Sequence, residues 1–377
     1  MKAPMKKLAK RESLDACAVL LAGGRGTRFW PRSRMRTPKQ LLNITGNQTM
    51  LRETMARLAS LVPSRNVWVV TNGEQAAAVR RELPGVPASH ILAEPVGRNT
   101  AAAIGLAAAH LAHEYGDALM AVLPSDAYIR DGVGYRRLVC AALDLACIPG
   151  NLVVLGIPPT RPETGYGYVE HGGVTARPRG VAAYAVRRFT EKPVLALAKK
   201  YVHSGKYFWN AGMFFWRAST FLENLQTFLP ATYEALRELE KTIGKRRYAS
   251  ALKRIYPELE SISVDYAVME PATRIAGVPR VSVIPAEVGW SDIGSWAAVH
   301  ELLASKPGAN VSAGPSFTLD AEGNYFWSPK KFVGAIGVQD LVVVETDDAL
   351  LLCSRERSQD VGKIVKWLED QKLGRLL

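Results

Sequence analysis

Glycines and cationic side chains are crowded into one short segment, residues 17–42. Gly23, Gly24 and Gly26 let the backbone approach a ligand closely and expose its N–H groups. Several cations follow within the same segment: Arg28, Arg32, Arg34, Arg36 and Lys39. Exposed N–H groups and clustered cations together bind polyphosphates. The segment therefore predicts a polyphosphate cradle, and the alternative is an arginine-rich surface loop.

Two common phosphate loops do not fit this segment. A Walker loop requires Lys-Ser or Lys-Thr directly after its last glycine, whereas Thr27-Arg28 follows Gly26 here. A dinucleotide-binding loop requires a small residue at the position of Arg28, so that helix and strand pack closely. A long cation at that position favours contact with phosphate instead.

Two aspartates are candidates for a metal site. Asp126 follows an apolar strand at residues 119–123, and Asp292 lies in a loop rich in glycine and tryptophan. Two carboxylates from separate loops suit Mg²⁺, which keeps waters and substrate oxygens as its other ligands. The alternatives are a turn-forming Asp126 and an Asp292 that caps a helix starting near Ser295.

Two further loops combine polar and charged groups. Residues Gly97, Asn99 and Thr100 open an alanine-rich helix, whose N-terminus favours anions or polar base edges. The same residues also fit a simple helix cap, with Asn99 or Thr100 at the N-cap. Glu191 could accept sugar hydroxyls while Lys192 pairs with a sugar phosphate. A solvated charge pair is the alternative there.

Aromatic and amide groups suggest a sugar-binding wall. Tyr166 and Gly167 offer an aromatic face and a backbone N–H, although a β-hairpin turn has the same composition. Asn210 could bond ring hydroxyls. Asp265 is a minor candidate, since it could bond a sugar or cap a helix.

The elements that position these residues alternate between strand and helix. Residues 17–22 form a continuous apolar run, which is typical of a buried parallel strand. Similar strands are predicted at 67–71, 90–93, 119–123 and 152–157, with helices at 49–61, 74–83 and 100–113. We therefore predict an α/β fold with a Rossmann-like, mostly parallel sheet and helices on both faces. Ligands of such sheets bind at the carboxyl ends of strands.

Three regions follow from the texture of the chain. Residues 1–15 are a basic tail, residues 16–305 a large α/β domain that carries all the candidate site residues, and residues 306–377 a small β-rich domain. Short apolar strands separated by Gly or Asp turns mark the last region, and a helix at about 359–371 closes it. We expect this helix to pack on another subunit of a homodimer.

Composition narrows the partners. The 48 Lys and Arg residues exceed the 35 Asp and Glu residues, giving a formal charge of +13 that suits acidic ligands. Neither an RNA-binding aromatic pattern nor zinc-finger spacing is present, so small phosphates are favoured over nucleic acid. The four cysteines form no CxxC pair, and no apolar run is long enough for a membrane span. We predict a cytoplasmic protein with no membrane partner.

Residues 17–42 resemble the signature of the sugar-1-phosphate nucleotidylyltransferases, and most of all that of the mannose-1-phosphate guanylyltransferases (GDP-mannose pyrophosphorylases). Seven further blocks resemble that family in the family's order: EPVGRNT at 94, LPSD at 123, GYGY at 165, EKP at 191, WNAGM at 209, SVDY at 263 and GWSDIGSW at 289. A single block would be weak evidence. The ordered set, which spans about residues 17–299, is highly specific.

The resemblance implies transfer of GMP from GTP to α-D-mannose 1-phosphate, by direct in-line attack assisted by Mg²⁺ or another divalent cation. It also implies a role for each matching residue. The catalytic residues would be Arg28, Lys39, Asp126 and Lys192, and the metal ligands Asp126 and Asp292. The nucleotide would contact Ala22, Gly23, Gly24, Gly26, Thr27, Gly97, Asn99, Thr100 and Ser125. The sugar phosphate would contact Tyr166, Gly167, Glu191, Lys192 and Asn210. The C-terminal region resembles the family's β-helix-like tail.

Two departures from the family pattern stand out. Ala127 follows Asp126 where the family usually has His, and Ala211 replaces a usual Ser. Two alternatives to GMP transfer onto mannose 1-phosphate stay open. One is the same chemistry with another nucleotide or hexose 1-phosphate, and the other is a catalytically silent nucleotide-binding regulator. Ala127 is the one feature in favour of the regulator. A nucleic-acid-binding role is suggested only by the charge.

Overall fold

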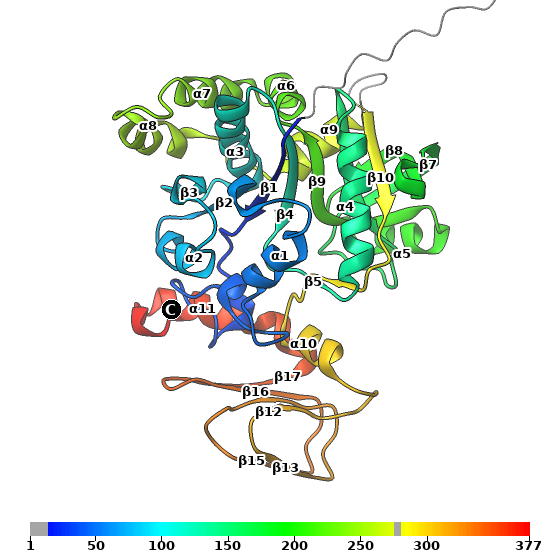
Figure 1. Cartoon of the computed structure of the whole chain (residues 1–377). Helices are drawn as coiled ribbons and strands as arrows, with labels where there is room; N and C mark the ends of the chain where they lie inside the picture. Colours follow the sequence, from blue (N-terminus) through cyan, green and yellow to red (C-terminus); the bar gives the residue numbers. More distant parts are fainter. Residues whose placement is uncertain (1–13, 275–279) are drawn as a thin grey trace, which may run out of the picture.

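A nine-stranded sheet forms the centre of the chain in the computed structural model, which describes residues 14–274 and 280–377 (Figure 1). Most of the predicted basic tail therefore lies outside the described residues. The strand order is β3-β2-β1-β4-β9-β6-β10-β8-β7. The strands are β1 (Ala16–Leu21), β2 (Val67–Asn72), β3 (Ile91–Glu94), β4 (Leu119–Pro124), β6 (Asn151–Ile157), β7 (Tyr168–Ala176), β8 (Ala183–Thr190), β9 (Tyr207–Arg217) and β10 (Arg280–Pro285).

The sheet mixes parallel and antiparallel pairs. Strands β1, β2, β3 and β4 are parallel, as predicted, and β6 is parallel to β10. The long strand β9 is inserted antiparallel between β4 and β6, and β7 and β8 form an antiparallel pair at the far edge. Strand β9 includes residues 209–213, the WNAGM block.

Helices cover both faces because side chains along each strand alternate in direction. In β1, Cys17 and Val19 belong to the apolar cluster that includes residues of α3, α6, α7 and α8, whereas Ala18 and Leu20 belong to the cluster that includes residues of α1, α2, α4 and α5. The predicted α/β class is therefore confirmed. The helices are α1 (Met50–Leu58), α2 (Ala76–Glu82), α3 (Asn99–Tyr115), α4 (Gly132–Ala146), α5 (Leu195–Ser204), α6 (Ala218–Phe228), α7 (Pro230–Glu240), α8 (Tyr248–Ile255), α9 (Glu270–Ala272), α10 (Trp296–Leu303) and α11 (Val361–Asp370).

The carboxyl ends of β1, β3 and β4, which lie within one parallel part of the sheet, carry the predicted loops. Leu21 at the end of β1 pairs with Pro124 at the end of β4 and with Val70 of β2. Asn72 of β2 pairs in turn with Glu94 at the end of β3. The loops at 23–26, 95–98 and 125–127 therefore leave the sheet at one edge, as the parallel arrangement predicted.

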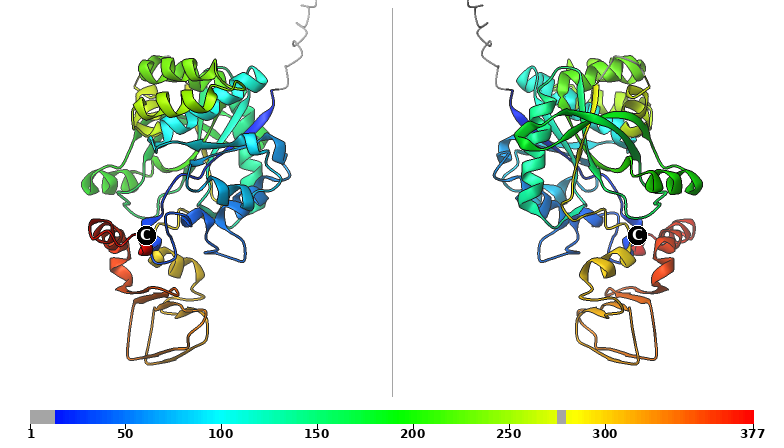
Figure 2. Two further views of the ribbon diagram at one scale, coloured as in Figure 1. Left: turned by 90° about the vertical axis from the view of Figure 1, so that its left-hand side faces the viewer. Right: turned by 90° about the vertical axis from the view of Figure 1, so that its right-hand side faces the viewer.

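The C-terminal region is a small β structure below the main sheet (Figure 2). Strands β12 (Val311–Ala313), β14 (Tyr325–Trp327) and β16 (Leu341–Glu345) are parallel, as are β13 (Ser316–Leu319) and β15 (Val333–Ile336). Such stacked parallel turns are those of a β-helix, which confirms the predicted β-rich character. Strand β17 (Leu350–Ser354) closes the region antiparallel to β16.

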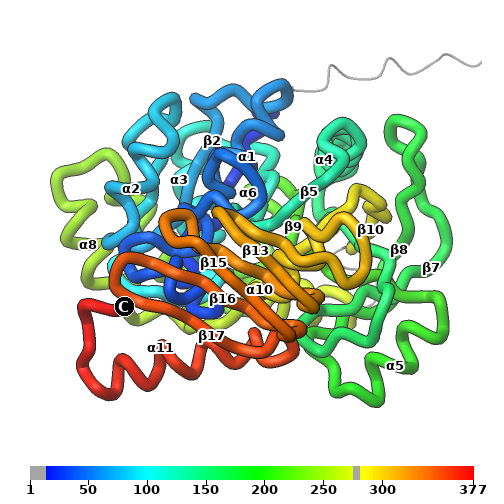
Figure 3. The backbone as a smooth tube through the Cα atoms, turned by 90° about the horizontal axis from the view of Figure 1, so that it is seen from below, coloured from blue at the N-terminus to red at the C-terminus, as the bar shows by residue number. Residues whose placement is uncertain are grey.

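Helix α11 packs on its own chain. Its buried residues Val361, Val365 and Leu368 share an apolar cluster with Phe29 and Trp30, which follow the glycines near the start of the chain. Figure 3 shows the helix running beside β17 under the main domain. This face of α11 is therefore covered by residues 29–30 and their neighbours, and the packing of the helix on another subunit stays a prediction.

Candidate active site

A cavity of about 420 Å³ opens at the carboxyl edge of β1, β3 and β4. Its wall includes seven residues that the sequence assigned to the nucleotide or the metal: Gly23, Gly24, Gly97, Asn99, Thr100, Ser125 and Asp126. Phe214, Val264 and Asp265 complete one side. The structure thus brings three separate sequence blocks to one hollow.

The glycine–arginine loop (residues 23–39) is held from behind by an amide. The Nε2 of Gln40 donates to the carbonyl oxygens of Ala22 at 2.8 Å and Gly24 at 3.1 Å. Gln40 is buried and also lines the cavity. Ala22 is also buried, but it is not among the residues that line the cavity. Gln40 was not predicted, although it directly follows Lys39 in the signature segment.

Gly26 sets the course of the loop away from the cavity. Its φ of +62° favours glycine, and a Cβ there would lie 2.5 Å from the Cβ of Lys39. The next residues form a short 3₁₀ helix, η1 (Thr27–Phe29), that turns toward the C-terminal region. Gly26, Thr27 and Arg28 consequently do not line the cavity.

The start of α3 is tied to a distant loop. Asn99 has a φ of +61°, and its Oδ1 accepts a 2.8 Å bond from the N–H of Thr100. The Oγ1 of Thr100 accepts a 2.8 Å bond from the N–H of Val264. Neither residue occupies the N-cap position, which falls on Arg98. Both side chains remain at the cavity wall.

A buried carboxylate stands at the same wall. Glu94 is 6% exposed, and its Oε1 accepts a 2.6 Å bond from the hydroxyl of Tyr256. Burial raises the pKa of Glu94, while the Tyr256 bond acts against that shift. The residue belongs to the EPVGRNT block, but nothing in the sequence shows that its side chain reaches the cavity.

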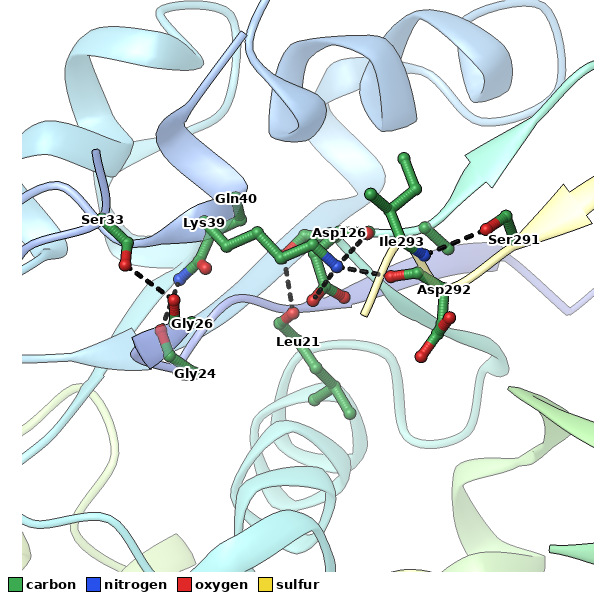
Figure 4. A network of polar contacts seen from close by, with 12 residues as sticks. Leu21, Gly24, Gly26, Ser33, Lys39, Gln40, Asp126, Ser291, Asp292 and Ile293 are labelled. Carbon is green, nitrogen blue, oxygen red and sulfur yellow. Dashed lines mark hydrogen bonds and ion pairs between the residues drawn. The ribbon is translucent and has the colours of Figure 1, made fainter. Parts of the chain in front are cut away.

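Lys39 joins the two predicted metal-binding loops (Figure 4). Its Nζ donates to the carboxylate of Asp126 at 3.0 Å, the carbonyl of Asp126 at 2.8 Å and the carbonyl of Asp292 at 2.5 Å. An ammonium has three N–H donors, so these acceptors use all of them. The geometry favours a positioning role for Lys39, and its direct participation in catalysis stays a prediction.

The Asp292 loop is brought to Asp126 by a short strand pair. Strand β5 (Tyr128–Ile129) pairs antiparallel with β11 (Trp290–Ser291), with Ser291 opposite Tyr128, so that both aspartates lie just beyond the same end of the pair. Ser295 caps α10, which rules out the alternative in which Asp292 is that cap. Asp292 Oδ1 accepts a 2.7 Å bond from the hydroxyl of Tyr166. Burial, and then the charge of Asp292, raises the pKa of Tyr166.

The two aspartates alone would supply only part of the coordination shell of a hard divalent cation. No group of three or more His, Cys, Asp or Glu side chains gathers as a metal site within residues 14–274 and 280–377. Two carboxylates are nevertheless the number expected where substrate phosphates supply further oxygens. Asp126 has a 43% exposed side chain, which leaves room for an ion and its waters.

A second group, the carboxylate–amide cluster (Gly167, Glu191, Asn210 and Asp265), lies beside the cavity. Asn210 Nδ2 donates to Asp265 Oδ1 at 2.7 Å, and the N–H of Asn210 donates to the carbonyl of Gly167 at 2.8 Å. A Cβ on Gly167 would lie 2.5 Å from Glu191 Oε2. Asp265 lines both groups, so the cluster adjoins the nucleotide wall.

Glu191 is poised to titrate near neutral pH. Its side chain is 7% exposed, and its Oε2 has no hydrogen-bond partner among the described residues. Burial and then the charge of Asp265 raise the pKa of Glu191 to about 7, while Lys192 acts against the shift. Burial also raises the pKa of Asp265. Lys192 Nζ lies 3.3 Å from Glu191 Oε1.

Comparison with known proteins decides the family. Residues 17–307, which are more than half of the chain, match the model described as Nucleotidyl transferase. The chain belongs to the nucleotidyl transferase family. Residues 314–368 match the MannoseP isomerase/GMP-like beta-helix domain, in agreement with the β-helix-like prediction for this region.

Several relatives of this nucleotidyl transferase cover nearly the whole chain. It is 40% identical over 359 residues to the mannose-1-phosphate guanylyltransferase RfbM of Salmonella typhimurium, covering 93% of this chain and 72% of the relative. It is also 40% identical to the xanthan biosynthesis protein XanB of Xanthomonas campestris pv. campestris (strain B100), with coverages of 94% and 73%. A crystal structure described as mannose-1-phosphate geranyltransferase from Thermus thermophilus has a TM-score of 0.84 and 34% identity, and covers 94% of this chain and 100% of that chain.

In this nucleotidyl transferase, other residues hold the turn in which Ala127 replaces the usual histidine. The carbonyl of Ala127 accepts a 3.0 Å bond from Arg57, and the side chain of Ala127 is buried. Lys39 holds both the carboxylate and the carbonyl of Asp126. The turn that carries Asp126 is therefore anchored on both sides without a histidine. Among the described residues, no helix combines the length and apolar character needed to cross a membrane.

Proposed function

We propose that this nucleotidyl transferase transfers GMP from GTP to α-D-mannose 1-phosphate and releases pyrophosphate. One observation carries the proposal: a nucleotide-sized cavity and the carboxylate–amide cluster meet at Asp265, beside the acidic loops joined by Lys39. The names of relatives such as RfbM support the sugar and the nucleotide.

Guanine is selected by the buried carboxylate of Glu94. Guanine presents two adjacent donors, N1–H and the 2-amino group, and a carboxylate can accept both. Uracil and thymine present one such donor, and adenine pairs a donor with an acceptor. The bond from Tyr256 fixes Glu94 Oε1, and the residue lines the cavity, where its carboxylate could accept from a base.

The variant Glu94→Gln should lose most of its preference for GTP. Hydrogen bonds to a charged group contribute about 1.5–3 kcal/mol, so kcat/KM for GTP should fall roughly 10- to 100-fold. Inosine triphosphate (ITP) lacks the 2-amino group, so its kcat/KM should fall less than that of GTP. The two nucleotides can be compared in a pyrophosphate-release assay. Glu74→Gln, at an exposed position, is the matched control. An unchanged GTP-to-ITP ratio in Glu94→Gln would show that other groups read the base.

The carboxylate–amide cluster binds the sugar phosphate. Glu191 Oε2 is a buried acceptor without a partner in the described structure, so a sugar hydroxyl would satisfy it. Asn210 offers its remaining amide donor, and Lys192 offers a cation for the phosphate. The half-exposed side chain of Lys192 can reach both solvent and a ligand.

The KM for mannose 1-phosphate should rise as the pH falls through about 7. Glu191 has a raised pKa, so it is ionised above that pH and protonated below it. Protonation removes the charge that strengthens its bonds to sugar hydroxyls. The substrate's own phosphate titrates in every variant, so the informative quantity is the difference from Glu191→Gln. That variant should have a higher KM at pH 8 and a flatter profile; parallel profiles for both enzymes would refute the role of Glu191.

Catalysis then consists of positioning and charge neutralisation. An oxygen of the sugar phosphate is already anionic and attacks the α-phosphorus without a general base. The new P–O bond forms as the bond to the bridging α–β oxygen breaks, and the electron pair leaves with pyrophosphate. The glycine–arginine loop holds the triphosphate, Arg28 polarises the α-phosphate and the leaving group, and Lys192 orients the nucleophile.

Asp126 and Asp292 would hold Mg²⁺ or another divalent cation. When bound, such an ion neutralises phosphate charge and draws the reacting groups together. Lys39 keeps the two acidic loops at a fixed separation before either substrate enters. Tyr166, which is predicted to contact the sugar phosphate, also donates a hydrogen bond to the Asp292 carboxylate and would orient it.

The test is pyrophosphate release over a grid of GTP, dTTP, UTP and ATP against mannose and glucose 1-phosphates, with Mg²⁺. Release confined to GTP with mannose 1-phosphate is the expected result. Release with another pair would keep the chemistry and replace the substrates. Nucleotide binding without release from any pair would refute the proposal and support the regulatory homologue.

A further inference from the structure

The C-terminal region reaches the proposed catalytic arginine directly. Arg28 Nη1 donates a 2.6 Å hydrogen bond to Oε1 of Gln359, a residue 331 positions later in the chain. Gln359 lies in η8 (Arg355–Asp360), the short helix directly before α11. The contact therefore joins the glycine–arginine loop to the β-helix-like tail across the whole sequence.

Gln359 is held in place by the packing of its neighbours. A Cβ on Gly362 would lie 3.4 Å from Thr27 Oγ1 and 3.9 Å from Arg28 Cγ, so the α11 backbone approaches η1 closely. Val361 and Val365 share a buried cluster with Phe29. The amide of Gln359 is thus presented to Arg28 from a rigid support, although both side chains are exposed to solvent.

The same arginine nitrogen lies over the second acidic loop. Arg28 Nη1 would be 3.3 Å from a Cβ on Gly294, two residues beyond Asp292. The guanidinium is consequently placed between Gln359 and the turn that carries a proposed metal ligand. We propose that Gln359 is a positioning residue that holds Arg28 ready for the triphosphate. This inference rests on the proposed function, since it assumes that Arg28 acts on phosphate.

The chemistry of the contact fits this task. Polar side chains of the tail engage three cations of the glycine–arginine loop, and two of these contacts are ion pairs: Arg25 with the carboxylate of Glu369, and Arg34 with that of Asp348. Arg28 alone of these three is met by a neutral amide. An amide oxygen orients a guanidinium without cancelling its charge, and one bond leaves four of the five N–H donors free. Arg28 therefore keeps both charge and donors for a phosphate.

The experiment is a double-mutant cycle that combines Gln359→Ala with Arg28→Ala. Gln359→Ala alone should lower kcat about 10- to 100-fold, the scale of a small misplacement of a catalytic group. The KM for mannose 1-phosphate and the thermal unfolding midpoint should stay unchanged. In the Arg28→Ala background, Gln359→Ala should have no further effect. Gln359→Glu should also be impaired, because an ion pair would cancel the charge of Arg28, whereas Gln359→Asn should be intermediate.

Gln371→Ala is the matched control, because Gln371 is an exposed glutamine at the other end of α11. It should leave kcat unchanged. Full activity of Gln359→Ala, or equal losses from it in the presence and in the absence of Arg28→Ala, would overturn the inference while leaving the proposed function intact. Full activity of Arg28→Ala itself would instead refute the role proposed for Arg28, and the inference with it.

Discussion

Asp126→Asn should lower kcat by about three orders of magnitude, or roughly 4 kcal/mol of transition-state stabilisation. The substitution keeps the size of the side chain but removes the charge that would hold a divalent cation. It also weakens the ion pair with Lys39. The measurement is steady-state pyrophosphate release at several Mg²⁺ concentrations, and added Mg²⁺ should restore only part of the activity.

The fold should survive this change. The Asp126 side chain is 43% exposed, so water can solvate whatever the new amide leaves unpaired. Asp144→Asn is the matched control, since Asp144 is 45% exposed and ion-paired with Arg179 away from the cavity. Its turnover should equal that of the unmodified enzyme. Near-normal turnover of Asp126→Asn would refute the metal-binding role.

Lys39→Met should be at least as damaging, with a loss of about 10³-fold or more in kcat/KM for both substrates. Lys39 is 5% exposed, and its Nζ holds three acceptors from two loops at once. Methionine fills much of the same space but leaves the Asp126 and Asp292 loops unconnected. Lys39→Arg should rescue poorly, because a planar guanidinium does not match three acceptors arranged around one nitrogen.

A positioning role for Lys39 can be separated from simple destabilisation. The thermal unfolding midpoint should fall only slightly, since Asp126 can turn to water. Lys330→Met is the control, because Lys330 is 71% exposed and pairs with Asp347 far from the cavity. A large drop in unfolding temperature together with normal turnover at low temperature would mean that Lys39 serves the fold and not the site.

Features that depend on local pattern were predictable from the sequence. The apolar run of β1 and the alternation of strand with helix indicate the α/β class, and parallel strands imply that their loops meet at one edge. The assignment of Gly23, Gly24, Asn99 and Asp126 to one neighbourhood followed from this rule together with the family resemblance. The structure brings these four residues to one cavity wall.

Features that depend on long-range packing were not predictable. Strand β9 carries no signal for its antiparallel insertion between two parallel strands, because a buried strand is apolar in either direction. The buried pair of Glu94 and Tyr256 joins residues 162 positions apart. The partners of Arg28 and Lys39 lie in regions that the sequence pattern assigns to a separate domain or a separate loop, so their hydrogen bonds could not be anticipated.

The shared core of α11 with Phe29 and Trp30 has a thermodynamic consequence. When two segments share one apolar core, a change in the conformational order of one affects the packing of the other. If a nucleotide orders the glycine–arginine loop as proposed, we expect it also to stabilise the docking of the C-terminal tail. Linkage is reciprocal. A molecule that binds the tail and alters its docking would change the affinity for nucleotide by the same factor by which nucleotide changes the affinity for that molecule.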